Sequence, residues 1–421
     1  MKNQESFAVP HAGPQSSGRL WSAPRRISFP LLLILLSLSL LLGACSTLEI
    51  NIERAAAPNP PTTPGSLTPS PKQPEIPTRT PAAPLPGMVY RTNDGLWKAS
   101  AGGQSVQILD RADGLISPDG AHALYLEKDT GEANNGQPTD LWLADLSTGE
   151  QRNLTRTPNR TETGFRWWPA RPDVILFSSR PQEIPPEPGV TGFLAMVDVS
   201  GNNYRVLDDQ NHTGGAPAPS PDGLTIAYGS GSTGWLYRWG AGPEVFDPAD
   251  YGLPSYRDAH IGSPSWSPDG TRLAWIVSGD FAVDKGLQMG VGIFDLETRT
   301  AQVLHLYDPV FSDGWPPAPV WSPDGKWLAF DAWAQDPDEA GVWVVWADGQ
   351  QEAGDQSLFT EYYLGGSHPV WISDGGWLAF NRALPGEGPS SWAAQTGIWG
   401  LIRLALPSDA YIVDWIAPSG N

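Results

Sequence analysis

The chain has 421 residues, with 20 Trp, 46 Gly, 43 Pro and only 17% charged residues. This composition excludes a disordered or mainly helical chain and favours many short strands separated by turns. The net charge of −20 argues against a nucleic-acid partner, because phosphate binding needs a basic surface. The single cysteine, Cys45, excludes an intramolecular disulfide and any metal site built only from cysteines.

Residues 1–44 have the features of a secretory signal. A basic stretch that includes Arg19, Arg25 and Arg26 precedes an apolar run over residues 31–42. That run has 12 residues, whereas a membrane-spanning helix needs about 20. A short apolar run behind a basic region predicts a cleaved signal peptide.

The apolar run leads into Leu42-Gly43-Ala44-Cys45. These four residues resemble the bacterial lipobox, in which the commoner order before the cysteine is Ala-Gly. The resemblance implies that the Cys45 thiol receives a diacylglycerol and becomes the mature N-terminus. An ordinary signal peptide with a chance cysteine is the alternative. We therefore expect an extracytoplasmic lipoprotein of the cell envelope, held at a bacterial membrane by its acyl chains.

A proline-rich segment follows the cysteine. Of the 32 residues from 55 to 86, 11 are proline. Proline fixes φ and removes backbone donors, so this segment cannot build a core. We expect residues 45–86 to form a disordered tether and residues 87–421 to form the folded domain.

One turn motif recurs about every 50 residues from residue 87 on, and such a period predicts a propeller or an array. Proline presets φ at a turn, aspartate accepts hydrogen bonds there, and glycine supplies a positive φ. We therefore interpret the aspartates of the motif as structural. The clear Ser-Pro-Asp-Gly copies contain Asp119, Asp222, Asp269 and Asp324, and looser copies lie at Asp173, Asp374 and Ser419.

Each repeat predicts four short antiparallel strands, which is the blade of a β-propeller. In the copy at Asp324 the expected strands are 319–321, 326–330, 341–346 and a weaker one near Leu358. Trp-Ser-Pro-Asp-Gly followed by Leu-Ala-Phe or Leu-Ala-Trp resembles the TolB-type, WD-like propeller repeat. The resemblance covers residues 87–421 and implies an all-β propeller. TolB proteins have an N-terminal α/β domain where this chain has its tether, so their partners are not carried over.

The two ends of the repeat region are predicted to share one blade. Segments 88–92, 96–100 and 105–109 supply second, third and fourth strands, and 411–416 supplies a first strand. Pairing between them would close the ring and remove exposed sheet edges. Seven first strands predict seven blades, and six is the alternative because the repeat at Asp173 is degenerate.

Long loops are expected on the face opposite the Ser-Pro-Asp-Gly turns, and loops of this kind usually carry binding. Aromatic residues with a few charges suit a protein, peptide or glycan ligand. The alternative is that these side chains only order the loops. The candidate ligand-binding residues are Arg166, His212, Arg257, His260, Asp313, Trp315, Asp331, Trp333, His368, Arg382 and Trp392.

The sequence favours a monomeric, non-catalytic binding module. It contains no H-E-x-x-H or EF-hand motif, so no metal or other cofactor is expected. It contains no G-x-S-x-G elbow, and no catalytic residue is assigned. A hydrolase that acts on glycans or lactones from the central channel is the alternative, because two loop carboxylates could converge there. The tryptophans that recur in register are expected to pack blade against blade: Trp266, Trp321, Trp371 and Trp415.

Overall fold

The computed structural model describes residues 80–417 apart from 129–137, 185–191, 214, 231–232, 254–259, 280–285, 311–315, 349–360, 373–374 and 384–387. Within these ranges the regular structure is strand, except for one short 3-10 helix, η1 (Pro248–Tyr251). No helix in these ranges is long and apolar enough to cross a membrane. The all-β prediction is confirmed, whereas the signal peptide, Cys45 and residues 45–79 of the tether lie outside the described residues.

The strands form five four-stranded sheets and one eight-stranded sheet. The sheet with order β28-β1-β2-β3 contains β28 (Tyr411–Trp415), β1 (Met88–Thr92), β2 (Gly95–Ala99) and β3 (Ser105–Leu109). The eight-stranded sheet contains β4 (Leu115–Ile116), β5 (His122–Lys128), β6 (Thr139–Asp145), β7 (Gln151–Asn153), β8 (Arg160–Trp167), β9 (Val174–Pro181), β10 (Gly192–Asp198) and β11 (Arg205–Thr213).

The other four sheets each consist of four consecutive antiparallel strands. They are β12 (Ala218–Pro219), β13 (Thr225–Ser230), β14 (Thr233–Arg238) and β15 (Gly242–Phe246); β16 (His260–Trp266), β17 (Arg272–Gly279), β18 (Gln288–Asp295) and β19 (Thr300–Tyr307); β20 (Val320–Trp321), β21 (Trp327–Ala332), β22 (Gly341–Trp346) and β23 (Glu361–Tyr363); and β24 (Ser367–Ile372), β25 (Trp377–Ala383), β26 (Pro389–Gln395) and β27 (Leu401–Arg403).

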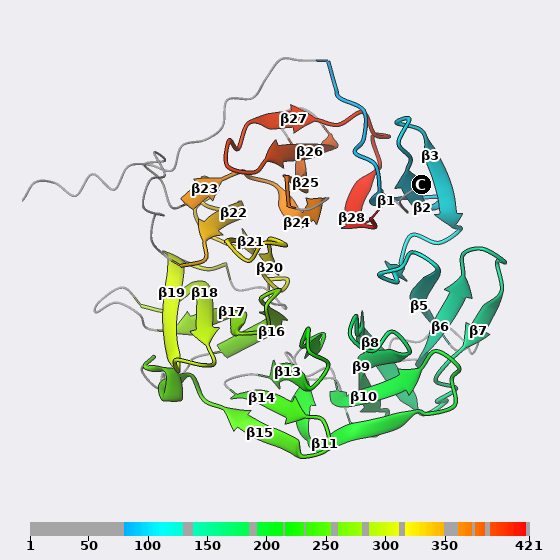
Figure 1. Ribbon diagram of the computed structural model, residues 1–421, viewed down its shortest axis with the longest axis vertical. Coiled ribbons are helices and arrows are strands. Elements are labelled where there is room, and N and C mark those ends of the chain that lie inside the picture. The colour runs from blue at the N-terminus through cyan, green and yellow to red at the C-terminus, as the bar shows by residue number, and fades with distance from the viewer. Residues whose placement is uncertain are drawn as a thin grey trace, which may run out of the picture. The chain divides into compact units, whose positions relative to one another are not determined.

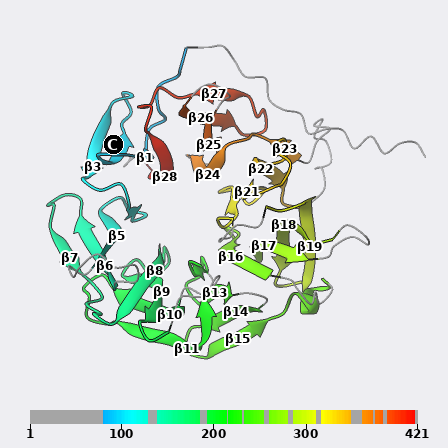
Figure 2. The same ribbon diagram turned by 180° about the vertical axis from the view of Figure 1, so that it is seen from behind.

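The sheets follow one another in chain order around a common centre (Figure 1). The first strands, such as β8, β16, β24 and β28, lie nearest the centre, and the last strands, such as β3, β15, β19 and β27, lie at the periphery. The reverse view shows the same order (Figure 2). Four antiparallel strands that run from the inside outwards are the arrangement of a propeller blade.

The Ser-Pro-Asp-Gly turns are built as the sequence predicts. The Ser322 hydroxyl donates to Asp324 at 2.6 Å and accepts from the Trp327 backbone N–H at 2.8 Å. Asp324 also accepts from the Lys326 backbone N–H at 3.1 Å, and Gly325 has a φ of 72°. The aspartate is thus used within its own turn.

The tryptophans in repeat register join neighbouring sheets. The indole N–H groups of Trp266, Trp321 and Trp371 donate to Ala218, Ser265 and Val320 backbone oxygens at 2.9, 3.3 and 3.0 Å. Each acceptor lies in or beside the first strand of the preceding sheet. The apolar core lies between successive sheets, and one buried cluster packs residues of β17 and β18 against β21 and β22.

The expected pairing between the two ends of the repeat region is present. β28 pairs antiparallel with β1, with Met88 opposite Trp415 and Arg91 opposite Tyr411. The segment before β1 also contacts the preceding sheet, because the Ala82 backbone N–H donates to the Arg403 oxygen at 2.8 Å. The described segment from Ala82 to Thr92 is therefore hydrogen-bonded both to β28 and to the preceding sheet.

Candidate functional site

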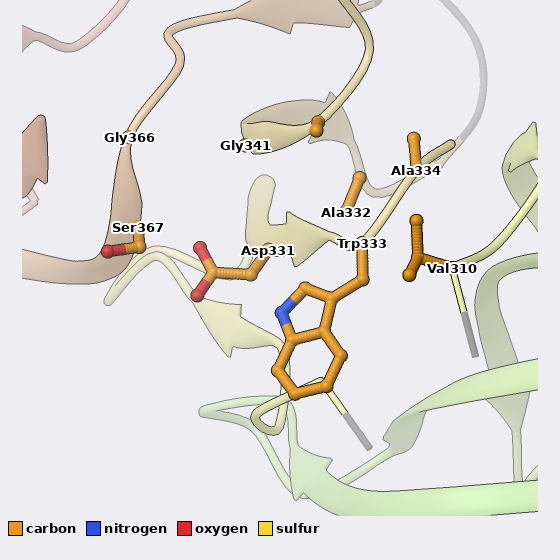
Figure 3. Close-up of a pocket in the computed structure, with 9 residues that line it drawn as sticks. Val310, Asp331, Ala332, Trp333, Ala334, Gly341, Gly366 and Ser367 are labelled. Carbon is orange, nitrogen blue, oxygen red and sulfur yellow. The ribbon is translucent and has the colours of Figure 1, made fainter. Parts of the chain in front are cut away.

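A cavity of about 350 Å³ lies where β21 and β22 meet the turn before β24. In Figure 3 the Asp331 carboxylate points toward Ser367, while Trp333 and Val310 form apolar walls. Among the described lining residues Asp331 is the only ionisable one. The cavity is lined by Val310, Asp331, Ala332, Trp333, Ala334, Ala340, Gly341, Gly366 and Ser367.

Asp331 is a buried carboxylate, 3% exposed, in β21. The His368 backbone N–H donates to its Oδ1 and Oδ2 at 3.1 and 3.0 Å. Burial raises the pKa of Asp331 to about 6, and the backbone hydrogen bond partly opposes this shift. The carboxylate is therefore mainly ionised at pH 7.

The charge of Asp331 has little compensation. The nearest basic atom among the described residues is His368 Nδ1, at 3.9 Å from Oδ2. Desolvation, helped by the charge of Arg91, lowers the pKa of His368, so this ring is mainly neutral at pH 7. A buried charge without a charged partner is unfavourable, which makes this position unusual within the core.

Asn381 occupies the same repeat position as Asp331, because each follows a Leu-Ala-Phe sequence. The Asn381 side chain donates to the Ile412 oxygen at 3.1 Å and accepts from the Ile412 N–H at 2.9 Å. Both residues thus hold the first strand of the next sheet. Asn381 makes this link without a charge, so the link at Asp331 does not require a carboxylate.

Tyr411 and Arg91 extend the polar group formed by His368 and Ser367 at the cavity. The Tyr411 hydroxyl is hydrogen-bonded to His368 Nδ1, and it lies 3.2 Å from the Ser367 hydroxyl. Arg91 stacks on the Tyr411 ring, with its guanidinium carbon 4.6 Å from the ring centroid. Burial raises the pKa of Tyr411, so its hydroxyl stays protonated and is a poor general base at neutral pH.

Two glycines allow the backbone to approach closely at the cavity. Gly366 has a φ of 79°, and a Cβ there would lie 2.2 Å from the Asn381 oxygen. A Cβ at Gly341 would lie 2.9 Å from the Gly365 Cα. Arg382, in β25, supports this turn because its Nη1 donates to the Leu364 oxygen at 3.0 Å. Arg382 is not among the residues that line the cavity.

The candidate residues of the sequence are only partly brought together. Asp331 and Trp333 line the cavity, and His368 and Arg382 lie next to it. Trp392 differs from the expectation of a loop residue. It lies in β26, is 2% exposed, and donates to the Ser390 hydroxyl at 2.9 Å. Its indole packs in the core, where it is closed to a ligand.

Arg166 lies in β8 and is not among the residues that line the cavity. This strand is one of those nearest the centre (Figure 1). The Arg166 side chain is accessible to solvent, but the surrounding inner strands partly desolvate its charge. Desolvation lowers its pKa, and the charge of Asp414 in β28 opposes this shift. Burial raises the pKa of Asp414 to about 6. These two opposite charges influence each other across the inner strands.

Other candidates have incomplete or no description. Arg257, Asp313 and Trp315 lie outside the described residues, as does Cys45. His212 and His260 lie in β11 and β16, where only their backbone is described, rather than in the loops where the sequence placed them. Within the described ranges no group of three or more His, Cys, Asp or Glu side chains could hold a metal ion.

Sequence reasoning missed Val310, Ser367, Tyr411 and Arg91 as neighbours of the site. Tyr411 and Arg91 meet only because β28 pairs with β1, so no local pattern marks them. For Asp331, which the sequence did propose, alignment of the repeats at Leu-Ala-Phe adds that its counterpart is the uncharged Asn381.

No known protein-family profile matches the sequence. A curated relative, the uncharacterized peptidase YuxL of Bacillus subtilis, is 24% identical over 233 residues. The match covers 55% of this chain and 31% of the relative, so the chain spans about a third of that protein.

Solved structures show similarity in fold. A prolyl endopeptidase structure matches with a TM-score of 0.50 and 13% identity, over 81% of this chain and 50% of that chain. TolB of Acinetobacter baumannii matches with a TM-score of 0.42 and 19% identity, over 62% of this chain and 61% of that chain. A β-propeller domain of Cps50 from Myceliophteria thermophila has a TM-score of 0.46 at 15% identity, over 72% of this chain and 89% of that chain. At these identities the likeness concerns the fold alone.

Proposed function

We propose that this chain is an extracytoplasmic lipoprotein whose propeller is a non-catalytic binding module for a peptide, protein or cell-envelope glycan. The observation that carries the binding function is the cavity with one buried carboxylate, Asp331, beside the half-buried indole of Trp333. A ligand site with apolar walls and few polar groups has this composition. General acid–base chemistry on a glycan needs two carboxylates, and the described lining supplies one.

We further propose that the folded domain is a closed ring of seven blades. The pairing of β28 with β1 supports closure. The eight-stranded sheet supports the number, because it consists of β4–β7 and β8–β11 joined through the single pair Thr139 and Thr161. Counted as two blades beside the five four-stranded sheets, it gives seven.

Replacing Trp333 by alanine should lower retention of the protein on cell-envelope extracts at least ten-fold. The change removes an aromatic wall of the cavity, and aromatic anchors dominate many binding sites. Retention is measured by pull-down of the purified variants, and bound material is analysed by mass spectrometry. The matched control is Trp239→Ala, which removes a half-buried indole that stacks on Arg171, outside the cavity. Equal retention of the Trp333 variant and wild type would contradict the proposed site.

Anchoring is proposed to depend on the Cys45 thiol, the only one in the chain. Cys45→Ala should move the protein from the membrane fraction to the soluble fraction, because one thioether carries the diacylglycerol. The measurement is fractionation followed by immunoblotting, with metabolic labelling by a fatty acid. A Ser46→Ala variant is the control. Unchanged membrane association of the Cys45 variant would refute the lipid anchor.

A hydrolase is the second candidate function, favoured by the hydrogen-bonded group of His368, Tyr411 and Ser367 at the cavity. The name of the Bacillus relative, a peptidase, points the same way for the part of the chain it covers. The mass spectra of the retention experiment separate the two functions. Ligand recovered intact supports binding, whereas cleaved ligand supports hydrolysis.

A further inference from the structure

The cavity combines a negative charge with apolar walls. Asp331 is 3% exposed and mainly ionised at neutral pH, and no Lys or Arg among the described residues lies within ion-pair distance of it. Buried charges in proteins are normally paired. A cationic group on a ligand would supply the charged partner that this carboxylate lacks among the described residues.

The carboxylate is not needed to hold the fold at this position. Asn381 makes the same link to the next sheet with an uncharged amide. Asparagine at position 331 would keep an acceptor for the His368 N–H and would carry no charge for burial to disfavour. The charge at Asp331 thus has a role outside the inter-sheet contact.

The walls indicate what carries the cation. Val310, Ala332, Ala334 and Trp333 present apolar surface next to the carboxylate (Figure 3). An aliphatic stem fits such walls, and an indole near an ammonium group adds cation–π attraction. A sugar ring would bring several hydroxyls, and the described lining offers only Ser367, Asp331 and the Trp333 indole N–H as polar side-chain groups.

We propose that the cavity binds the primary ammonium group of a lysine or similar diamino side chain in a peptide ligand. This inference rests on the proposed binding function and specifies its ligand. The ammonium group pairs with Asp331, and the methylene stem lies along Trp333 and Val310. The chain's net charge of −20 favours the approach of such a cationic ligand.

The test compares Nα-acetyl-lysine methylamide with its norleucine counterpart, which has an aliphatic stem without the ammonium group. Isothermal titration calorimetry on the full mature protein should show at least ten-fold weaker binding of the norleucine probe. Asp331→Asn should weaken lysine-probe binding at least ten-fold without lowering the melting temperature, because the chain accommodates asparagine at the equivalent position. Glu297→Gln, which removes an exposed carboxylate outside the lining residues, is the matched surface control.

Lowering the pH from 7.5 to 5 should weaken lysine-probe binding to wild type, because Asp331, with a pKa of about 6, becomes protonated. Three other titratable groups lie near Asp331, namely His368, Tyr411 and Tyr307, and the charged Arg91 stacks on Tyr411. Both tyrosines stay protonated over this pH range because burial raises their pKa values, and protonation of His368 acts in the same direction as protonation of Asp331. The pH profile of lysine-probe binding to the Asp331→Asn variant separates the contribution of Asp331 from that of His368. Binding that no longer depends on pH supports Asp331, whereas the same pH dependence as in wild type counts against it.

Equal binding of the two probes, or tighter binding of glucosamine than of the lysine probe, would overturn the inference. If the lysine probe does not bind but Trp333→Ala still loses retention on envelope extracts, the ammonium inference fails and the binding function stands. If the lysine probe does not bind and Trp333→Ala is retained like wild type, both the ammonium inference and the proposed binding function fail.

Discussion

A variant that ends at Ala410 should fail to fold cooperatively. The truncation removes β28, exposes the edge of β1 and deletes Ile412, which is fully buried. Loss of a buried aliphatic side chain costs about 2–5 kcal/mol, and each orphaned buried polar group of Asn381 costs about 1–3 kcal/mol more. The sum rivals the total stability of a typical protein, about 5–15 kcal/mol. Circular dichroism melts and size-exclusion chromatography measure the effect.

Two controls show whether the loss comes from the pairing of β28 with β1. A variant that ends at Ala417 keeps β28 and should melt like wild type. Ile412→Ala keeps the strand and should lose about 2–5 kcal/mol of unfolding free energy in urea titrations. A cooperative melt of the shorter variant near the wild-type temperature would show that the terminal strand does not stabilise the domain.

Much of the fold could be predicted from the sequence because its signals are local and repeated. The turn at Ser322-Pro323-Asp324-Gly325 specifies its own hydrogen bonds within six residues. Trp321 and Trp371 repeat one inter-sheet contact, so their register in the sequence implied their role. Leu358, near which the weaker fourth strand is expected, lies outside the described residues, and the described part of that strand is β23 (Glu361–Tyr363).

The site was harder to predict because it depends on contacts between different repeats. Asp331 and His368 were both proposed, but nothing local shows that the His368 backbone, rather than its ring, donates to the carboxylate at about 3 Å. Trp392 was taken for a loop residue because it follows a long proline- and glycine-rich segment. In the structure the strand β26 begins earlier, at Pro389, and turns this indole into the core.

A second buried acid, Glu162 in β8, lies apart from the cavity and gives the domain a pH-dependent stability. Its side chain is fully buried, Oε1 accepts from the Thr157 hydroxyl at 2.7 Å, and Oε2 has no partner among the described residues. Burial raises the pKa of Glu162 to about 7, hydrogen bonds from Thr157 and Ser179 and the charge of Arg160 oppose this, and the charge of Asp140 adds to it.

The native state therefore keeps a proton at Glu162 that the unfolded state, with a pKa near 4.5, releases at lower pH. The resulting contribution to stability is complete below about pH 4.5 and is lost as the pH rises through 7. Asp331 and Asp414, each with a pKa raised to about 6, act in the same direction. The unfolding free energy of the wild type should thus fall between pH 5 and pH 8.

Glu162→Gln should raise the unfolding free energy by about 2–3 kcal/mol at pH 8 and by much less at pH 5. The amide keeps an acceptor for Thr157 and removes the charge that is costly to bury. Urea titrations at both pH values measure the difference, and Glu150→Gln, at an exposed position, is the matched control. Because the other two acids titrate alike in variant and wild type, the change in pH dependence isolates Glu162. Parallel pH profiles of variant and wild type would mean that Glu162 stays ionised in the native protein, with a cation or water satisfying Oε2.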